Sequence, residues 1–76
     1  MFEVGDKIEF IGPPAHPLHG NPKSNPSYYS DHVIVFFGKP SSFPEAQVAL
    51  VECVEPEHGT KCHSYEILFP HHWRKK

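Results

Sequence analysis

Apolar and polar residues alternate near the start of the chain. From Glu3 to Ile11, the apolar residues Val4, Ile8 and Phe10 share one parity, while Lys7 and Glu9 take the other. A period of two is typical of a strand with one face buried. The pattern therefore predicts a half-buried first strand, and Gly5-Asp6 marks its opening.

Three further segments have strand character. His32–Phe37 is apolar and β-branched or aromatic after its first residue, which predicts a central strand covered on both faces. Gln47–Val54 and Lys61–Phe69 are the third and fourth predicted strands. No ten-residue stretch has a helical period, so we expect no long helix. A single helical turn at Ser64–Leu68 is an alternative, because Tyr65 and Leu68 are three residues apart.

The segments between the strands carry turn residues. Gly12–Asp31 is a long loop with five of the nine prolines, and its Asn25-Pro26 pair favours the start of a turn. Gly38–Ala46 is a shorter loop. Pro56–Thr60 predicts a tight turn in which Gly59 adopts a positive φ.

This pattern predicts an all-β protein of 76 residues. Four or five short strands with turn signals between them indicate a small barrel or a strongly bent antiparallel sheet, with at most one short helical turn. We expect one domain over residues 1–72, with its long loop at 12–31. Residues 73–76 are then a basic C-terminal tail, expected to be a solvated end.

Two stretches resemble a known superfold. Val4-Gly5-Asp6-Lys7-Ile8-Glu9-Phe10, followed by a glycine and a long loop, resembles the opening strand of SH3-like barrels, a superfold that includes KOW and Tudor-type domains. Tyr65-Glu66-Ile67-Leu68-Phe69-Pro70 looks like their short turn and closing strand. The resemblance covers architecture only and points to no individual family. It implies an SH3-like barrel whose binding loop is the segment at 12–31.

Charge and hydropathy exclude several functions. Of the net charge of −2, the last three residues contribute +3, which leaves −5 for residues 1–73. Such an acidic body argues against a broad phosphate-binding face. No apolar run approaches the roughly 20 residues of a membrane span, and the acidic start is unlike a signal peptide. We therefore expect a cytoplasmic protein with no membrane partner and with reduced cysteines.

The pair Cys53 and Cys62 lies in a predicted hairpin, in which opposed residues have numbers that sum to 115 and these two cysteines face each other. Zinc, a disulfide or two small buried side chains are the alternatives. We favour the third, because Cys62 and His63 point to opposite faces of a strand and cannot bind one ion. No catalytic motif is present, so we expect no enzyme activity and no cofactor.

Aromatic residues outside the strand pattern are the best candidates for binding. Trp, Tyr and Arg concentrate binding energy at interfaces, so the predicted partner-binding residues are Tyr28, Tyr29, Phe43, Trp73 and Arg74. The favoured hypothesis is a non-enzymatic protein-binding module, a phage or bacterial accessory protein that occupies a partner's surface.

Three alternatives to this hypothesis stay open. A nucleic-acid-binding barrel would use the same aromatic residues with Lys23, Lys39 and the basic tail, although the acidic body disfavours it. A domain stabilised by metal at Cys53 and Cys62 is a lesser alternative. A homodimer formed through an exposed strand edge is the third.

Overall fold

The computed structural model describes residues 2–13, 23, 25–38 and 42–76. Residues 14–22 and 24 of the predicted loop, together with Lys39, lie outside these residues. The elements within the described residues are a 3-10 turn at Pro26–Tyr28 and the strands β1 (Lys7–Phe10), β2 (Ser30–Phe37), β3 (Gln47–Val54), β4 (Lys61–Leu68) and β5 (Trp73–Lys75). The all-β prediction is confirmed. No helix in this described part of the chain is long and apolar enough to cross a membrane.

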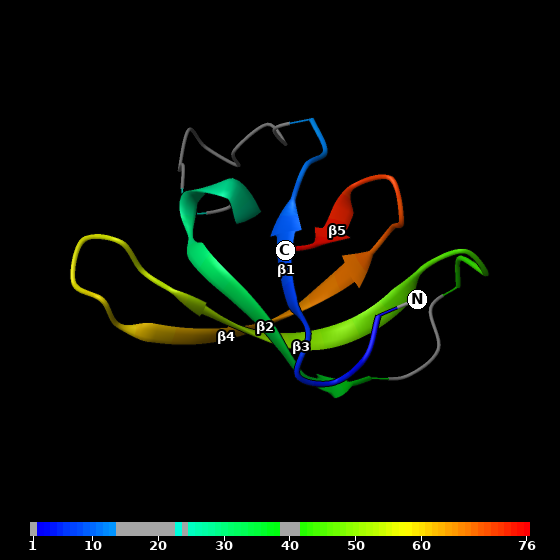
Figure 1. Cartoon of the computed structure of the whole chain (residues 1–76), viewed down its shortest axis with the longest axis horizontal. Coiled ribbons are helices and arrows are strands. Elements are labelled where there is room, and N and C mark those ends of the chain that lie inside the picture. The colour runs from blue at the N-terminus through cyan, green and yellow to red at the C-terminus, as the bar shows by residue number, and fades with distance from the viewer. Residues whose placement is uncertain (1, 14–22, 24, 39–41) are drawn as a thin grey trace.

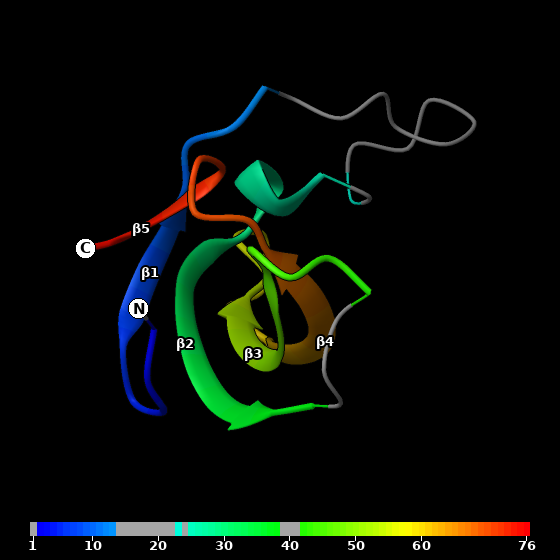
Figure 2. The same ribbon diagram turned by 90° about the vertical axis from the view of Figure 1, so that its right-hand side faces the viewer.

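The strands form one antiparallel sheet in the order β4-β3-β2-β1-β5, so β4 and β5 are its edges. Figures 1 and 2 show that the sheet is strongly curved. The curvature lets Ile8 of β1 and Trp73 of β5 pack against the inner faces of the other strands. This architecture is compatible with a small barrel-like fold.

The core consists of a few apolar side chains from every strand. Six buried residues form it, and three partly buried phenylalanines pack against them: Ile8, Ile34, Ala49, Val51, Leu68 and Trp73, with Phe2, Phe10 and Phe37. We call the sheet face that carries these residues the inner face. A core this small is what a chain of this length can bury.

Turn chemistry sets the ends of the first strand and of the β3–β4 hairpin. Gly5 has φ +92°, and the Asp6 carboxylate accepts a hydrogen bond from the Glu3 N–H at 2.8 Å. These two features make a turn, so β1 begins at Lys7 and not at the predicted Glu3. Gly59 has φ +68°, which confirms the positive φ predicted for the hairpin turn.

The prediction that β2 is covered on both faces is wrong. Val35 and Phe36 are both exposed. The pairing of β2 with β3 shifts register between Ile34 and Phe36, as at a β-bulge. The shift turns both side chains outward and returns Phe37 to the inner face, and no other described segment covers Phe36.

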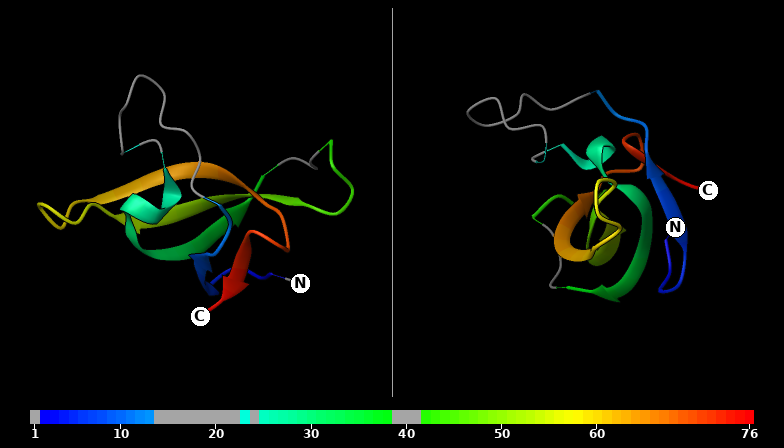
Figure 3. Two further views of the ribbon diagram at one scale, coloured as in Figure 1. Left: turned by 90° about the horizontal axis from the view of Figure 1, so that it is seen from above. Right: turned by 90° about the vertical axis from the view of Figure 1, so that its left-hand side faces the viewer.

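The C-terminal residues are not the solvated end that their composition predicted. Trp73–Lys75 forms β5, and its three residues pair antiparallel with β1. Trp73 is 2% exposed, because its ring packs edge-on against Phe10 and His32 at centroid distances of 5.2 and 5.1 Å. Figure 3 shows β5 beside β1. The alternative of a helical turn at Ser64–Leu68 is also wrong, since these residues belong to β4.

Candidate functional site

Tyr28 and Tyr29 lie at the end of the long loop, against the turn of the β3–β4 hairpin. The loop turns here because Pro26 starts a 3-10 turn and the Asn25 side chain accepts a hydrogen bond from the Ser27 N–H. The Tyr28 hydroxyl donates to Glu55 Oε1 at 2.8 Å, and the two tyrosine rings meet edge-on at 5.1 Å. Both side chains are only half-exposed. Tyr28 therefore ties the loop to the hairpin.

The carboxylate of Glu55 organises this junction. It accepts hydrogen bonds from Tyr28 and from the N–H groups of Glu57 and His58, at 3.0 and 2.9 Å for the latter two. Burial raises the pKa of Glu55, but these three hydrogen bonds outweigh burial and the net pKa is lowered. The pKa of Tyr28 is raised from 10.0 to about 12, and the hydrogen bond to Glu55 is the largest cause.

Replacing Tyr28 with phenylalanine tests this junction through its alkaline titration. Because the folded pKa of Tyr28 is raised above its unfolded value, its contribution to stability is fully present below pH 10.0 and is lost as the pH rises toward about 12. We expect the wild type to lose more of its free energy of unfolding between pH 9 and 11 than Tyr28→Phe does. Urea denaturation at each pH, followed by circular dichroism, measures the difference. Parallel pH profiles of the two proteins would show that Tyr28 makes no such bond.

Phe43 lies elsewhere, in a cluster of rings beside the turn that leads into β5. Its ring packs on Phe69 at 5.1 Å, and Phe69 also contacts His71 and His72, each at 5.6 Å. Phe43 keeps 45% of its surface exposed. His72 contacts Phe10, and Phe10 contacts Trp73, which is buried and offers a partner no surface.

Arg74 and the two lysines after it face acidic side chains of neighbouring segments. Arg74 pairs with Glu9, and the Nζ atoms of Lys75 and Lys76 lie 3.4 Å from carboxylate oxygens of Asp6 and Asp31. The basic charge of the C-terminus is therefore matched locally by acids of the body. The five predicted partner-binding residues do not form one surface in the described contacts: the tyrosines lie at the hairpin, Phe43 in the ring cluster and Arg74 on β5.

The two cysteines have the predicted register. Cys53 pairs directly with Cys62, and Val54 with Lys61. Both thiols are free; Cys53 Sγ lies 3.6 Å from the Cys62 carbonyl oxygen and Cys62 Sγ lies 3.8 Å from that of Thr60. Burial raises the pKa of the Cys53 thiol. Among the residues that the structure describes, no group of three or more metal-ligating side chains occurs.

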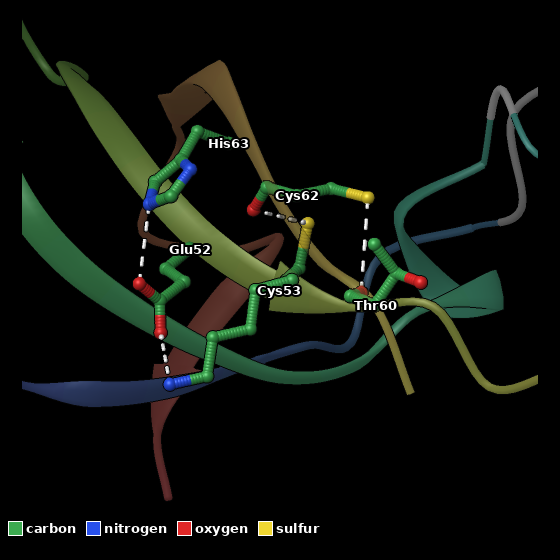
Figure 4. A network of polar contacts seen from close by, with 6 residues as sticks. Glu52, Cys53, Thr60, Cys62 and His63 are labelled. Carbon is green, nitrogen blue, oxygen red and sulfur yellow. Dashed lines mark hydrogen bonds and ion pairs between the residues drawn. The ribbon is translucent and has the colours of Figure 1, made fainter. Parts of the chain in front are cut away.

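His63 lies on the opposite face of β4 from Cys62, as Figure 4 shows. Its Nε2 is 3.1 Å from Glu52 Oε2, and Lys61 Nζ is 3.5 Å from Glu52 Oε1. These charged groups occupy one end of the outer face of the β3–β4 hairpin. Beyond them, toward the other end of the hairpin, the outer face becomes apolar.

This apolar part of the outer face is the candidate site, and we call it the outer patch. Its residues come from three adjacent strands: Phe36, Val48, Leu50, Tyr65 and Ile67. Leu50 is paired with Phe36 on one side and with Tyr65 on the other, and Val48 is paired with Ile67. Phe36, Tyr65 and Ile67 are 56%, 60% and 42% exposed. Paired positions on neighbouring strands bring these side chains within contact range.

A depression next to the outer patch depends on a glycine. It has a volume of about 640 Å³ and is lined by Phe36, Phe37, Gly38, Val48 and Tyr65. A Cβ at Gly38 would lie 3.1 Å from the Tyr65 ring and 3.4 Å from a Val48 methyl group. The absence of a side chain at Gly38 therefore keeps this part of the surface hollow.

The outer patch was not predicted from the sequence, although the predicted hairpin register contained the signal. Residues whose numbers sum to 115 include Leu50 with Tyr65 and Val48 with Ile67, all on the face away from the cysteines. The sequence pattern did not show whether another part of the chain covers that face. Comparisons with protein-family models, curated proteins and solved structures give no significant match to this chain.

Proposed function

We propose that the protein is a small, non-enzymatic protein-binding module that acts by occupying a partner's surface, and that the outer patch is its contact surface. The observation that carries this proposal is the exposure of Phe36 on β2 and of Tyr65 and Ile67 on β4, on the two sides of the β3 residues that pair with them. Contiguous exposed apolar surface marks interaction sites on soluble proteins, and large aromatic side chains are enriched among the residues that dominate binding energy.

The patch is favoured over the loop residues because strands hold it in place. Tyr28 is engaged with Glu55, and Trp73 is buried. Phe43, Tyr29 and Arg74 stay predicted secondary contacts. The matched acidic partners of Arg74, Lys75 and Lys76 count against the nucleic-acid alternative, which needs free basic side chains.

We also propose that the bent sheet is an SH3-like barrel. The support is that a short turn after β4 leads into a closing strand, β5, which pairs with the opening strand β1. The resemblance placed the short turn and closing strand at Tyr65–Pro70, whereas Tyr65–Leu68 belong to β4 and the closing strand is Trp73–Lys75. The fold by itself does not assign a function.

A capture experiment with two matched double variants tests the proposed contact surface. The wild type is immobilised and exposed to lysate with and without nuclease, beside Phe36→Ser/Tyr65→Ser and a control, Val4→Ser/Ile11→Ser, that removes comparably exposed apolar side chains elsewhere. We expect a stoichiometric protein band that survives nuclease and persists with the control. Affinity for the purified partner should fall about 30-fold or more in the patch variant, as for loss of one hot spot worth about 2 kcal/mol.

Two outcomes of this experiment would contradict the proposal. If the patch variant and the control retain the partner equally, the contact surface lies elsewhere. If every captured protein disappears with nuclease, the nucleic-acid alternative replaces the protein-binding module. Circular dichroism of the variants verifies that both keep the wild-type fold.

A further inference from the structure

The strand β4 carries Tyr65 and Ile67 of the outer patch and is an edge of the sheet. Its eight residues, Lys61–Leu68, pair with β3 on one side, and it stands at the end of the strand order. Figures 1 and 2 show β4 as the outermost strand next to β3. An edge strand presents unpaired N–H and C=O groups, which form a template for another strand. Backbone groups that can pair with an additional strand therefore lie directly beside the outer patch.

The inner row of β4 contains a half-buried acid. Cys62, Ser64, Glu66 and Leu68 alternate with the exposed residues of this strand. Burial raises the pKa of the Glu66 carboxyl, although a hydrogen bond from the Ser64 hydroxyl at 3.3 Å opposes the rise. Within the described part of the chain, Glu66 takes part in no ion pair, whereas Glu52 on the outer face has both Lys61 and His63.

The Glu66 carboxylate restricts which strands can pair with the edge of β4. Inward-pointing charges on edge strands disfavour the pairing of another chain, because pairing buries the charge further. A strand with Lys or Arg at the opposed position removes this penalty by supplying the counter-charge. An added strand without such a residue would leave the Glu66 carboxylate buried and unpaired.

A second copy of this chain does not satisfy the requirement. In an antiparallel pairing of β4 with β4 that keeps the two inner faces together, only inner-row residues can oppose Glu66. That row consists of Cys62, Ser64, Glu66 and Leu68, and none of them is a cation. No register of this antiparallel self-pairing therefore neutralises Glu66, which argues against an antiparallel homodimer at this edge.

We propose that β4 accepts an extended segment of a partner protein that adds antiparallel to its edge, with a Lys or Arg opposite Glu66 and an apolar residue on each side of that basic residue. The two apolar residues would face outward beside Tyr65 and Ile67 and would extend the outer patch. The recognised segment is therefore apolar–basic–apolar. This inference rests on the proposed function, because it names the kind of segment that the same surface binds.

A selection from random heptapeptides displayed on phage tests the inference with the full chain. We expect selected peptides to share a basic residue between two apolar residues. One such peptide is then synthesised with its basic residue and with glutamine in that place. Each form is titrated against the wild type and against Glu66→Gln, which keeps the shape of the side chain. Either change alone should weaken binding about tenfold, and both together should weaken it little further.

A control and a mapping experiment complete the test. Glu52→Gln removes a carboxylate from the outer face and should leave the affinity for the basic peptide within about twofold. Amide NMR signals of β4 should shift on peptide addition more than those of β5. The inference is overturned if selection enriches no basic residue, if Glu66→Gln binds like the wild type, or if the shifts map to another edge. A dimer of the free chain joined at β4 would overturn it too.

The outcomes separate this inference from the proposed function. If Phe36→Ser/Tyr65→Ser abolishes partner capture while Glu66→Gln has no effect, the patch binds a partner but not by strand addition opposite Glu66. If the patch variant captures the partner normally, the proposed function itself fails.

Discussion

Replacing Trp73 with alanine is expected to lower the free energy of unfolding by about 3–5 kcal/mol, the usual cost of truncating a buried tryptophan. Trp73 is 2% exposed and packs edge-on against Phe10 and His32. It also belongs to β5, which has three residues and, in the described part of the chain, pairs with β1 alone. Because small domains are stable by only about 5–15 kcal/mol, the variant should lose a large share of its stability.

Urea denaturation followed by circular dichroism measures this loss, since the chain has a single tryptophan and the variant has no tryptophan fluorescence. Arg74→Ala is the matched control on the same strand. Its ion pair with Glu9 is exposed, so we expect a change of less than about 1 kcal/mol. Equal midpoints for Trp73→Ala and the wild type would mean that the C-terminal residues are the solvated end that their composition predicts.

Replacing His32 with phenylalanine is expected to raise the free energy of unfolding by about 1–3 kcal/mol, the cost of a buried polar atom without a partner. His32 is buried against Trp73, and its Nε2 is the buried side-chain atom that has no hydrogen-bond partner among the described residues. Phenylalanine keeps an aromatic ring at this contact and removes the unpaired nitrogen.

The increase in the free energy of unfolding caused by His32→Phe should be larger at acidic pH. Burial lowers the pKa of His32; the charge of Asp31 opposes this shift and that of Lys76 adds to it. The folded pKa thus lies below the ordinary value of 6.5. Above pH 6.5, titration of His32 does not lower the free energy of unfolding. As the pH falls from 6.5 through the folded pKa, the unfolded chain binds this proton more readily than the folded one, and the free energy of unfolding decreases.

Urea titrations at pH 8 and pH 5 measure this pH dependence. We expect the wild type to lose more stability between these two values than His32→Phe does. His71→Gln, which removes an exposed histidine, should retain the wild-type dependence. If all three proteins lose the same stability, titration of His32 is not coupled to folding.

The β3–β4 hairpin shows which structural features the local sequence can predict. The strand character of Gln47–Val54 and Lys61–Phe69, with Gly59 between them, predicted both strands, the turn and the pairing of Cys53 with Cys62. These features depend on residues close in sequence. The same register placed Leu50 opposite Tyr65 and Val48 opposite Ile67, so the pairing of the β3 and β4 members of the outer patch was predictable from the sequence.

Features that depend on contacts between segments distant in the chain could not be predicted from the local sequence. Strand β5 has three residues, too few for a periodic pattern, and it exists because β1 supplies its partner more than sixty positions earlier. The register shifts in β2 accompany the bending of the sheet, and the second of them turns Phe36 outward. The burial of Trp73 follows from the same curvature, so its assignment to a binding surface failed.

The sequence by itself determined the all-β class, the two strands of the central hairpin and their register, because period and turn residues act over a few positions. The tertiary structure decided which faces stay open. Curvature buries one face around Ile34 and Val51, leaves the opposite face of β2, β3 and β4 uncovered in the described chain, and makes β4 an edge with Glu66 on its inner side. Exposure is a property of the whole packed chain, and so the candidate site emerged only from the fold.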